Sequence, residues 1–364
     1  MRYRKLSAAI LLVCTILLGT CAQQAQKTVD AASQKEHNDT MQTIAKETAI
    51  QLKEKELEVE GSLLTPEEVA RRSLPGIICW GDSLTYGWYG DGVSFPKVLE
   101  ERLAREILDI PVINMGACGE DSITIAGRSG GIPYVVSEDM VIGENAEPVP
   151  IVFTSEDGRK VLPSFRTDVG INSCSIAGVE GTLTILEPLN PDSAYTFTRS
   201  TAGEAVSVSK GTKIITEASA EYQDYLSIVF VGTNGGYTDY DDLIAQQNAI
   251  IASRTANTDR FLIIGITNGK QEDMAEYDAA MQAAYGEKYF NLREYMSVYG
   301  LANAGLTPTA EDELAMAEGI VPSSLRVDPV HFTPKGYETI GNAVYEKLNT
   351  LGYFDEAREA LANH

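Results

Sequence analysis

Four short, largely apolar runs constrain the fold of this chain more than any other feature. They occupy residues 77–80, 111–114, 226–231 and 261–266 and lack a sustained apolar–polar alternation. Runs of this kind are typical of strands that are covered on both faces, as in parallel sheets. Helical patterns lie between several of them, such as Phe95 to Ile107 and Asp241 to Ser253. The alternation predicts an α/β fold with a parallel sheet flanked by helices.

Residues 122–222 interrupt this alternation of strand and helix patterns. They contain short alternating segments, such as 181–185, 195–198 and 205–208, separated by Gly, Pro, Asn and Asp. This texture predicts a small all-β insertion. Two roles stay open for it, a structural lid or packing module and a module that binds a glycan or another partner. The α/β domain is then discontinuous and comprises residues 64–121 and 223–364.

The N-terminal segment is predicted to be an export signal over residues 1–21. Arg2, Arg4 and Lys5 precede an apolar stretch, Ala8 to Leu18, that is short for a membrane span. Leu18 to Cys21 resembles a lipobox, in which Cys21 would be lipidated. The alternative is ordinary cleavage after Ala22, and the pattern leaves both open. We therefore expect an extracellular or cell-surface protein.

The segment that follows, residues 22–63, is polar and poor in aromatic residues, which indicates a tether. The ordered part is predicted to begin at Thr65, because Thr65-Pro66-Glu67-Glu68 is a helix-start signature. The predicted organisation is thus a signal, a tether, and a folded part with one insertion.

Charge and cysteine content exclude several classes of partner. The net charge is −23, and removal of the basic leader makes the protein more acidic still. Nucleic acids and anionic lipid headgroups require a basic surface, so neither is an expected partner, and a membrane is reached only through an N-terminal lipid anchor. Cys79, Cys118 and Cys174 remain after the leader, an odd number without the spacing of a metal site. We predict no disulfide framework, no metal and no cofactor.

Polar, glycine-containing turns follow the first three predicted parallel strands. They are Gly81-Asp82-Ser83-Leu84, Asn114 to Gly119, and Gly232-Thr233-Asn234. Open α/β sheets bind ligands at the carboxyl ends of their strands, so these turns are expected to converge on one crevice.

Histidine-based chemistry can use only one residue of the folded part. Of the three histidines, His37 lies in the polar leader and His364 is the last residue, which leaves His331. Ser83 is a weak nucleophile unless a base lies within hydrogen-bond reach, and Asp328 is three positions before His331. Ser83, His331 and Asp328 are therefore a candidate catalytic set. His331 also precedes a helix start at Thr333-Pro334, and both roles are compatible.

With these residues in view, the chain resembles the GDSL or SGNH hydrolase family, whose characteristic serine, glycine, asparagine and histidine occur in that order. Ser83 matches the serine in Gly-Asp-Ser-Leu, and Gly119 matches the glycine in an Asn-x-Gly-x-x-Gly turn. Asn234 matches the asparagine in Gly-Thr-Asn, and His331 the histidine in Asp-x-x-His, with Asp328 as third triad member. The resemblance covers about residues 76–121 and 224–350. It implies a flavodoxin-like three-layer α/β/α sandwich, here with the β insertion.

The resemblance also implies an acyl-enzyme mechanism with an oxyanion hole. Its donors would be the N–H groups of Ser83 and Gly119 and the side-chain amide of Asn234. Asparagine is also common in turns, and Gly116 is an alternative donor to Gly119. Gly235 stands where many relatives have aspartate after the asparagine, so the substrate contacts of that loop do not carry over.

Four residues around the nucleophile are candidates for substrate binding: Asp82, Tyr86, Trp88 and Tyr89. The aromatic residues would stack on a sugar ring or, alternatively, pack the first helix against the sheet. Asp239, Asp241 and Asp242 are interpreted as helix-start residues rather than as a cation site.

The expected function is a secreted or surface-anchored serine ester hydrolase that removes acetyl or other short acyl groups from carbohydrate. The substrate partner would be an acylated carbohydrate or another ester. A lipase or lysophospholipase, and a surface glycan-binding module without turnover, are the alternatives.

Overall fold

The computed structural model describes residues 64–163, 173–187 and 194–362. Residues Thr65–His364 form one compact unit. The expected signal, the tether and Cys21 lie outside the described residues. No helix in the described ranges is both long and apolar enough to cross a membrane.

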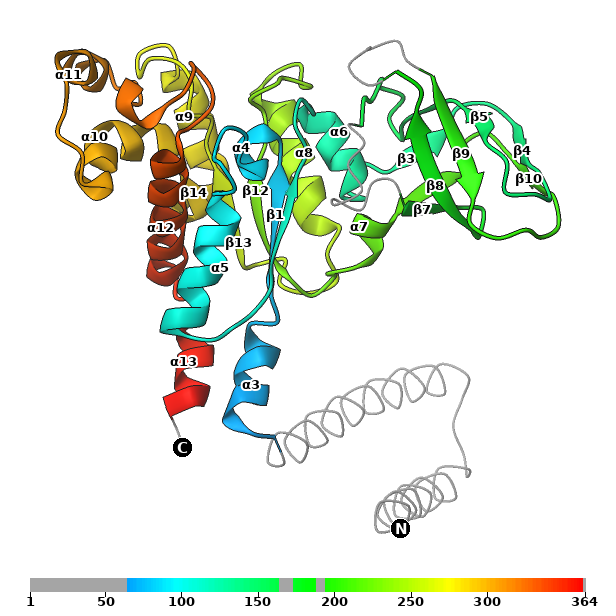
Figure 1. The fold of residues 1–364 in the computed structure, drawn as a ribbon, viewed down its shortest axis with the longest axis horizontal. Coiled ribbons are helices and arrows are strands. Elements are labelled where there is room, and N and C mark those ends of the chain that lie inside the picture. Colours follow the sequence, from blue (N-terminus) through cyan, green and yellow to red (C-terminus); the bar gives the residue numbers. More distant parts are fainter. Residues whose placement is uncertain (1–63, 164–172, 188–193, 363–364) are drawn as a thin grey trace, which may run out of the picture. The chain divides into compact units, whose positions relative to one another are not determined.

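A parallel sheet of five strands forms the centre of the α/β domain (Figure 1). The strands are β1 (Ile77–Gly81), β2 (Val112–Gly116), β12 (Leu226–Phe230), β13 (Phe261–Ile264) and β14 (Tyr289–Phe290). Their order across the sheet is β2-β1-β12-β13-β14, and every pairing is parallel. The chain therefore runs from β1 outward to one side and returns to continue on the other. This reversal makes the carboxyl ends of β1 and β12 the place where such a sheet binds ligands.

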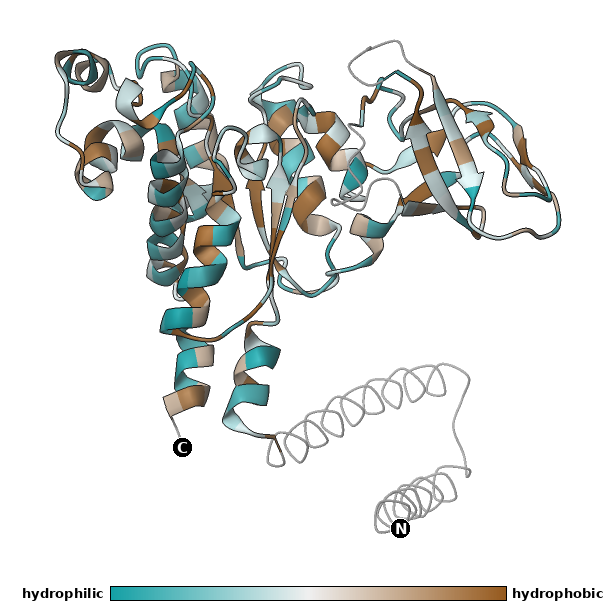
Figure 2. Cartoon of the chain, viewed as in Figure 1, coloured by the Kyte–Doolittle hydropathy of each residue, from teal (hydrophilic) through white to brown (hydrophobic). Residues whose placement is uncertain are grey.

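Helices cover both faces of this sheet because its strands are apolar on both sides. Every residue of β1 and β12 is buried. Ile78 and Trp80 belong to one apolar core, and Ile77 and Cys79 belong to the other. Figure 2 shows the corresponding pattern, with mainly hydrophobic central strands and helices such as α5 that carry both kinds of residue. The three-layer α/β/α arrangement follows.

The first face is covered by α6 (Ser122–Arg128), α8 (Tyr240–Ala252) and α9 (Ala275–Tyr285). The second is covered by α5 (Phe95–Glu106), α10 (Leu292–Ala304) and α12 (Pro334–Thr350), with α3 (Pro66–Ser73) and α13 (Asp355–Ala362) packed on each other. The remaining short elements of this domain are α4 (Ser83–Tyr86), η2 (Gly286–Lys288), α11 (Ala310–Ala317) and η3 (Ser323–Leu325). The helix starts expected at Thr65 and Thr333 are confirmed, since both side chains cap the following helix and Thr65 forms a capping box with Glu68.

Antiparallel strands occupy the region between α6 and β12. They are β3 (Tyr134–Val136), β4 (Met140–Ile142), β5 (Val149–Ile151), β6 (Phe153–Ser155), β7 (Ser173–Ile176), β8 (Val179–Ile185), β9 (Tyr195–Arg199), β10 (Val206–Val208) and β11 (Lys213–Thr216), followed by the short helix α7 (Glu217–Ala220). Within the described ranges, seven of them form one sheet in the order β5-β9-β8-β7-β11-β3-β6, and β10 pairs with β4. Alternate residues of β8 are buried, as expected for a sheet with one core face.

The insertion begins later than its composition indicates. Residues 122–128 form helix α6, whose start is capped by Asp121 accepting a hydrogen bond from the N–H of Thr124. Its apolar residues are buried in the core of the α/β domain, and it packs against α8. The strands themselves therefore run from Tyr134 to Thr216. Tyr134 Oη donates to the Thr124 carbonyl at 2.6 Å, which ties the first strand to α6.

Candidate active site

Ser83 lies at the turn between strand β1 and helix α4. It is the first residue of that helix and is 6% exposed. Asp82 caps the helix, with Oδ1 accepting a hydrogen bond from the Leu84 N–H at 2.9 Å. The turn is tight because strand β2 ends against it: a Cβ at Gly116 would lie 2.1 Å from the Tyr86 nitrogen. Only glycine fits there.

A continuous chain of hydrogen bonds joins Ser83, His331 and Asp328. Ser83 Oγ lies 2.9 Å from His331 Nε2, and His331 Nδ1 lies 2.8 Å from Asp328 Oδ2. An ionised carboxylate can only accept, so the network assigns the ring proton to Nδ1 and leaves the Nε2 lone pair facing the serine hydroxyl. The structure thus brings together three residues from the two ends of the domain.

The segment between η3 and α12 holds the histidine in place. Asp328 Oδ1 accepts hydrogen bonds from the backbone N–H groups of Val330 and His331, at 2.8 and 2.7 Å. The N–H of Val327 in turn donates to the carbonyl of His331 at 2.9 Å. The loop therefore closes on the carboxylate and presents the imidazole at a fixed angle.

The environment keeps Asp328 ionised. Desolvation raises the pKa of its carboxyl, but the hydrogen bonds from the His331 N–H, the His331 ring and the Val330 N–H outweigh it, so the net pKa lies below the usual value. A carboxylate at this position favours positive charge on the imidazole when the ring takes up a proton.

Three hydrogen-bond donors that could stabilise an oxyanion follow the ends of neighbouring strands. They are the Ser83 N–H after β1, the Gly119 N–H after β2 and the Asn234 side-chain amide after β12. Within the described part of the chain, neither the Ser83 N–H nor the Gly119 N–H donates to another protein group. Gly119 has a φ of +80°, and a Cβ there would meet nothing within 4 Å. Asn234 follows β12, and its Nδ2 donates to the Glu120 carbonyl at 2.9 Å. The side-chain amide of Asn234 is therefore tied to the residue that follows Gly119.

Gly116, the alternative to Gly119, is already engaged. Its N–H donates to Asn114 Oδ1 at 2.9 Å, in a position crowded by α4. Besides the Asn234–Glu120 hydrogen bond, two more bonds join the loops that carry Gly119 and Asn234. Ser122 donates to the Gly235 carbonyl through its N–H at 3.0 Å and through its hydroxyl at 2.9 Å. Because the Gly116 N–H is already bonded to Asn114, the Gly119 N–H is the better candidate for an oxyanion donor.

Asp82, a candidate for substrate binding from the sequence, is buried and caps helix α4. The residue is 0% exposed, and its carboxylate serves as the cap of α4. Desolvation, with a contribution from the nearby Glu120, raises its pKa to about 7. An aspartate after a strand can face solvent or cap the next helix, and here the close packing of α4 on the sheet selects the cap.

Two of the three aromatic candidates are exposed, and one of them, Tyr89, lies beside His331. Trp88 is 43% and Tyr89 50% exposed, whereas Tyr86 is half-buried. The Tyr89 and His331 ring centroids are 5.6 Å apart in an edge-on arrangement, and those of Trp88 and Tyr89 are 5.7 Å apart. Trp88 and Tyr89 therefore do not act as core packing for the first helix.

Asp239, Asp241 and Asp242 lie at the start of α8. Asp239 caps the helix by accepting a hydrogen bond from the Asp242 N–H at 2.8 Å, and Asp242 pairs with Arg159 of the insertion at 2.8 Å. No group of His, Cys, Asp and Glu in the described residues is arranged to hold a metal ion. Cys79, Cys118 and Cys174 form no disulfide within the described residues.

A buried ion pair was not singled out from the sequence. Glu120 and Arg128 have fully buried side chains, and Arg128 Nη2 lies 2.9 Å from Glu120 Oε2. The available signal was an arginine inside the otherwise apolar and small-residue stretch from 123 to 131.

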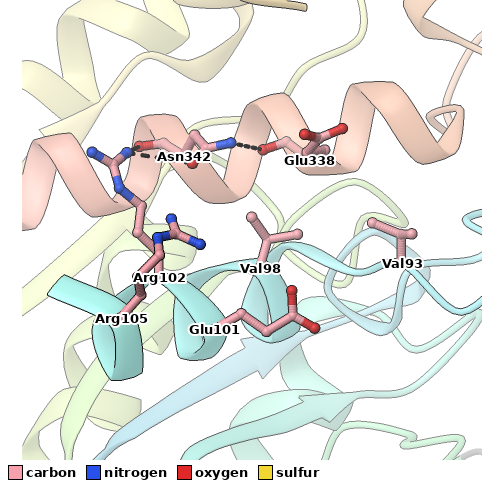
Figure 3. Close-up of a pocket in the computed structure, with 7 residues that line it drawn as sticks. All are labelled: Val93, Val98, Glu101, Arg102, Arg105, Glu338 and Asn342. Carbon is pink, nitrogen blue, oxygen red and sulfur yellow. Dashed lines mark hydrogen bonds between the residues drawn. The ribbon is translucent and has the colours of Figure 1, made fainter. Parts of the chain in front are cut away.

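Two surface hollows lie apart from the Ser83–His331–Asp328 chain. The one in Figure 3 is lined by residues of the loop before α5 and of helices α5 and α12: Val93, Val98, Glu101, Arg102, Arg105, Glu338 and Asn342. Asn342 accepts a hydrogen bond from Arg102 there, and the lining residues include no serine, threonine, cysteine or histidine. The other is lined by the start of α8 and part of α9 and begins at Tyr237, three residues after Asn234.

Comparison with known proteins does not place the chain in a family. No family model matches the sequence, and no curated protein matches it. A solved structure described as "Peptidoglycan O-acetylesterase in action, 5 min" is similar at 13% identity and a TM-score of 0.33, over 79% of this chain and 96% of that one. Similarity at this level transfers neither a fold nor an activity.

Proposed function

We propose that this protein is a serine ester hydrolase in which Ser83 is the nucleophile. The observation that carries the proposal is the unbroken hydrogen-bond chain from Asp328 through His331 to Ser83. Its position supports the same conclusion, because Ser83 follows β1 at the reversal of strand order, where open α/β sheets bind ligands.

In the first step, Ser83 Oγ attacks the ester carbonyl carbon while His331 Nε2 takes the hydroxyl proton. The carbonyl oxygen becomes an oxyanion, and the N–H groups of Ser83 and Gly119 and the amide of Asn234 stabilise it. Asp328 stabilises the imidazolium. His331 then gives the proton to the leaving alcohol oxygen as the bond from carbon to that oxygen breaks, which leaves an acyl group on Ser83.

In the second step, water attacks the acyl-enzyme. His331 takes a proton from the water, the second oxyanion occupies the same donors, and the proton passes to Ser83 Oγ as the acyl–serine bond breaks. The products are a carboxylic acid and the regenerated serine. No redox partner is consumed.

The order Ser83, Gly119, Asn234 and His331 supports membership of the GDSL or SGNH hydrolases as part of this proposal. The strand order of the sheet supports it too, since numbering its strands along the chain gives the flavodoxin-like order 2-1-3-4-5.

We propose further that the enzyme acts outside the cell and removes short acyl groups, acetyl above all, from carbohydrate. The export-like leader and the β insertion beside the hydrolase domain support this. A long-chain lipase and a glycan-binding module without turnover are the outcomes that the following experiment separates.

The test is hydrolysis of p-nitrophenyl esters from acetate to palmitate by the protein, by Ser83→Ala and by a matched control, Ser297→Ala, which removes a buried hydroxyl from α10. We expect turnover of short esters, lost in Ser83→Ala and kept in the control. A fluorophosphonate probe should add its mass to the Ser83 peptide. A preference for long chains would replace the deacetylase by a lipase, and no turnover with no labelling would refute the hydrolase.

A further inference from the structure

We propose that Trp88 and Tyr89 form a binding platform for a sugar ring on the alcohol side of the scissile ester. This inference rests on the proposed function and names the substrate class of the same site. The described residues contain three exposed aromatic side chains, and two of them, Trp88 and Tyr89, are adjacent to each other. Tyr89 is also adjacent to His331. The third is Tyr299, on α10.

The platform is built into the fold. The backbone of Trp88 is held on both sides: its N–H donates to the Ser83 carbonyl at 3.0 Å, and its carbonyl accepts from the buried Tyr337 hydroxyl at 2.9 Å. Tyr89 has a φ of +64°, a region that a bulky residue adopts only at a cost. Strain of this kind persists where the surroundings impose it, and it is concentrated at functional sites.

The chemistry of the reaction decides which half of the ester faces these rings. His331 must protonate the leaving alcohol oxygen, so that oxygen lies next to Nε2. The oxyanion donors Gly119 and Asn234 receive the carbonyl oxygen instead. The ring of Tyr89, edge-on to His331, is therefore next to the alcohol and not to the acyl group.

The chemical character of the platform favours a neutral, ring-shaped alcohol. A sugar has an apolar C–H face and polar edges, which suits half-exposed indole and phenol rings whose N–H and O–H remain in water. Two acidic residues belong to the segments that carry the rings: Asp91 is exposed in the same loop, and Asp328 is partly exposed and pairs with His331. Carboxylates accept hydrogen bonds from hydroxyls but repel phosphate, which argues against a phospholipid headgroup.

The test compares two acetate esters that differ only in the alcohol. We measure kcat/KM for a mono-O-acetylated methyl glucoside and for ethyl acetate, in the wild type, Trp88→Ala, Tyr89→Asn and the control Tyr299→Ala. Asparagine is chosen because it tolerates the left-handed backbone of residue 89. We expect the ratio of sugar ester to ethyl acetate to fall roughly tenfold in the two platform variants and to stay unchanged in Tyr299→Ala.

A second readout does not need turnover. The chain has two tryptophans, and Trp80 is fully buried, so a ligand that stacks on the platform changes the emission of Trp88 alone. In Ser83→Ala, titration with the acetylated glucoside should change tryptophan emission, and in Ser83→Ala with Trp88→Phe it should not. Equal losses on both esters, or no emission change, would overturn the platform while leaving the hydrolase intact. Full activity of Ser83→Ala would instead refute the proposed function.

Discussion

Arg128 and Glu120 form an ion pair beneath the loop of Gly119, with Nε and Nη2 of the arginine both 2.9 Å from one carboxylate oxygen. Neither side chain is exposed. Nη2 also donates to the Met115 carbonyl at 2.9 Å, and the Glu120 carbonyl accepts the amide of Asn234. The pair therefore links strand β2, the Gly119 loop and the Asn234 loop.

Removal of one partner should cost far more than removal of both. Arg128→Met leaves the Glu120 carboxylate buried without its partner, and we expect a loss of roughly 3–5 kcal/mol in the free energy of unfolding. The double variant with Glu120→Leu should recover much of it, because no buried charge remains. Urea unfolding measures both. A double variant no more stable than Arg128→Met would show that packing, and not the unpaired charge, sets the cost.

Asn234→Ala should reduce kcat on a short ester by a few hundred-fold, because loss of one oxyanion donor costs about 3 kcal/mol in the transition state. KM should change much less, since the oxyanion forms only after attack. The matched control is Asn303→Ala, an exposed asparagine on α10. An unchanged kcat would remove Asn234 from the mechanism.

Asp328→Asn should lower kcat by about a thousand-fold or more. The amide oxygen can keep the backbone hydrogen bonds from Val330 and His331, so the loop is expected to fold. The amide nitrogen would then face Nδ1 and force the ring proton onto Nε2, which removes the acceptor for Ser83. Steady-state kinetics tests this, with urea unfolding as a check on stability. A loss below tenfold would mean that His331 works without its carboxylate.

Asp82 should make the stability of the protein fall as pH rises. Its folded-state pKa of about 7 exceeds the ordinary value of 3.8, so between these values the folded state binds the proton that the unfolded state has lost. Stability therefore decreases from about pH 4 to pH 7 through this group. Asp82→Asn keeps an oxygen for the Leu84 N–H but carries no titrating group.

We compare the free energy of unfolding of Asp82→Asn with that of the wild type at two pH values. The difference, variant minus wild type, should be roughly 2–3 kcal/mol larger at pH 8 than at pH 5. Urea unfolding of the two proteins at both pH values measures it. The same difference at both pH values would mean that Asp82 titrates in the folded protein as it does in water.

Features with a local cause could be predicted from the sequence. The start of α3 follows from Thr65 and Glu68, which satisfy each other within four residues. Strand β1 was predictable because every residue of it is buried, so its apolar run carries no alternation. The set of Ser83, Asp328 and His331 stood out because one histidine remained after the leader and the terminus were set aside.

Features that depend on distant packing could not be predicted. Residues 122–128 were assigned to the β insertion, yet they form α6, because α8 and the sheet bury their apolar side chains. The role of Asp82 depended on how closely α4 packs on the sheet, and composition carries no information on that. The pair of Glu120 and Arg128 is recognisable only once α6 brings Arg128 next to Glu120, which precedes the helix.

Ser83 and His331 are 248 positions apart in the chain, although their side chains meet. In a nascent chain, Ser83 therefore has no general base beside it until the last strands and α12 are in place. On the proposed mechanism, ester cleavage requires nearly the whole domain to be folded. A chain that stops before His331 would have no esterase activity. On the proposals that the protein is exported and is a hydrolase, a polypeptide that has not yet folded would have no activity, because Ser83 and His331 have not met.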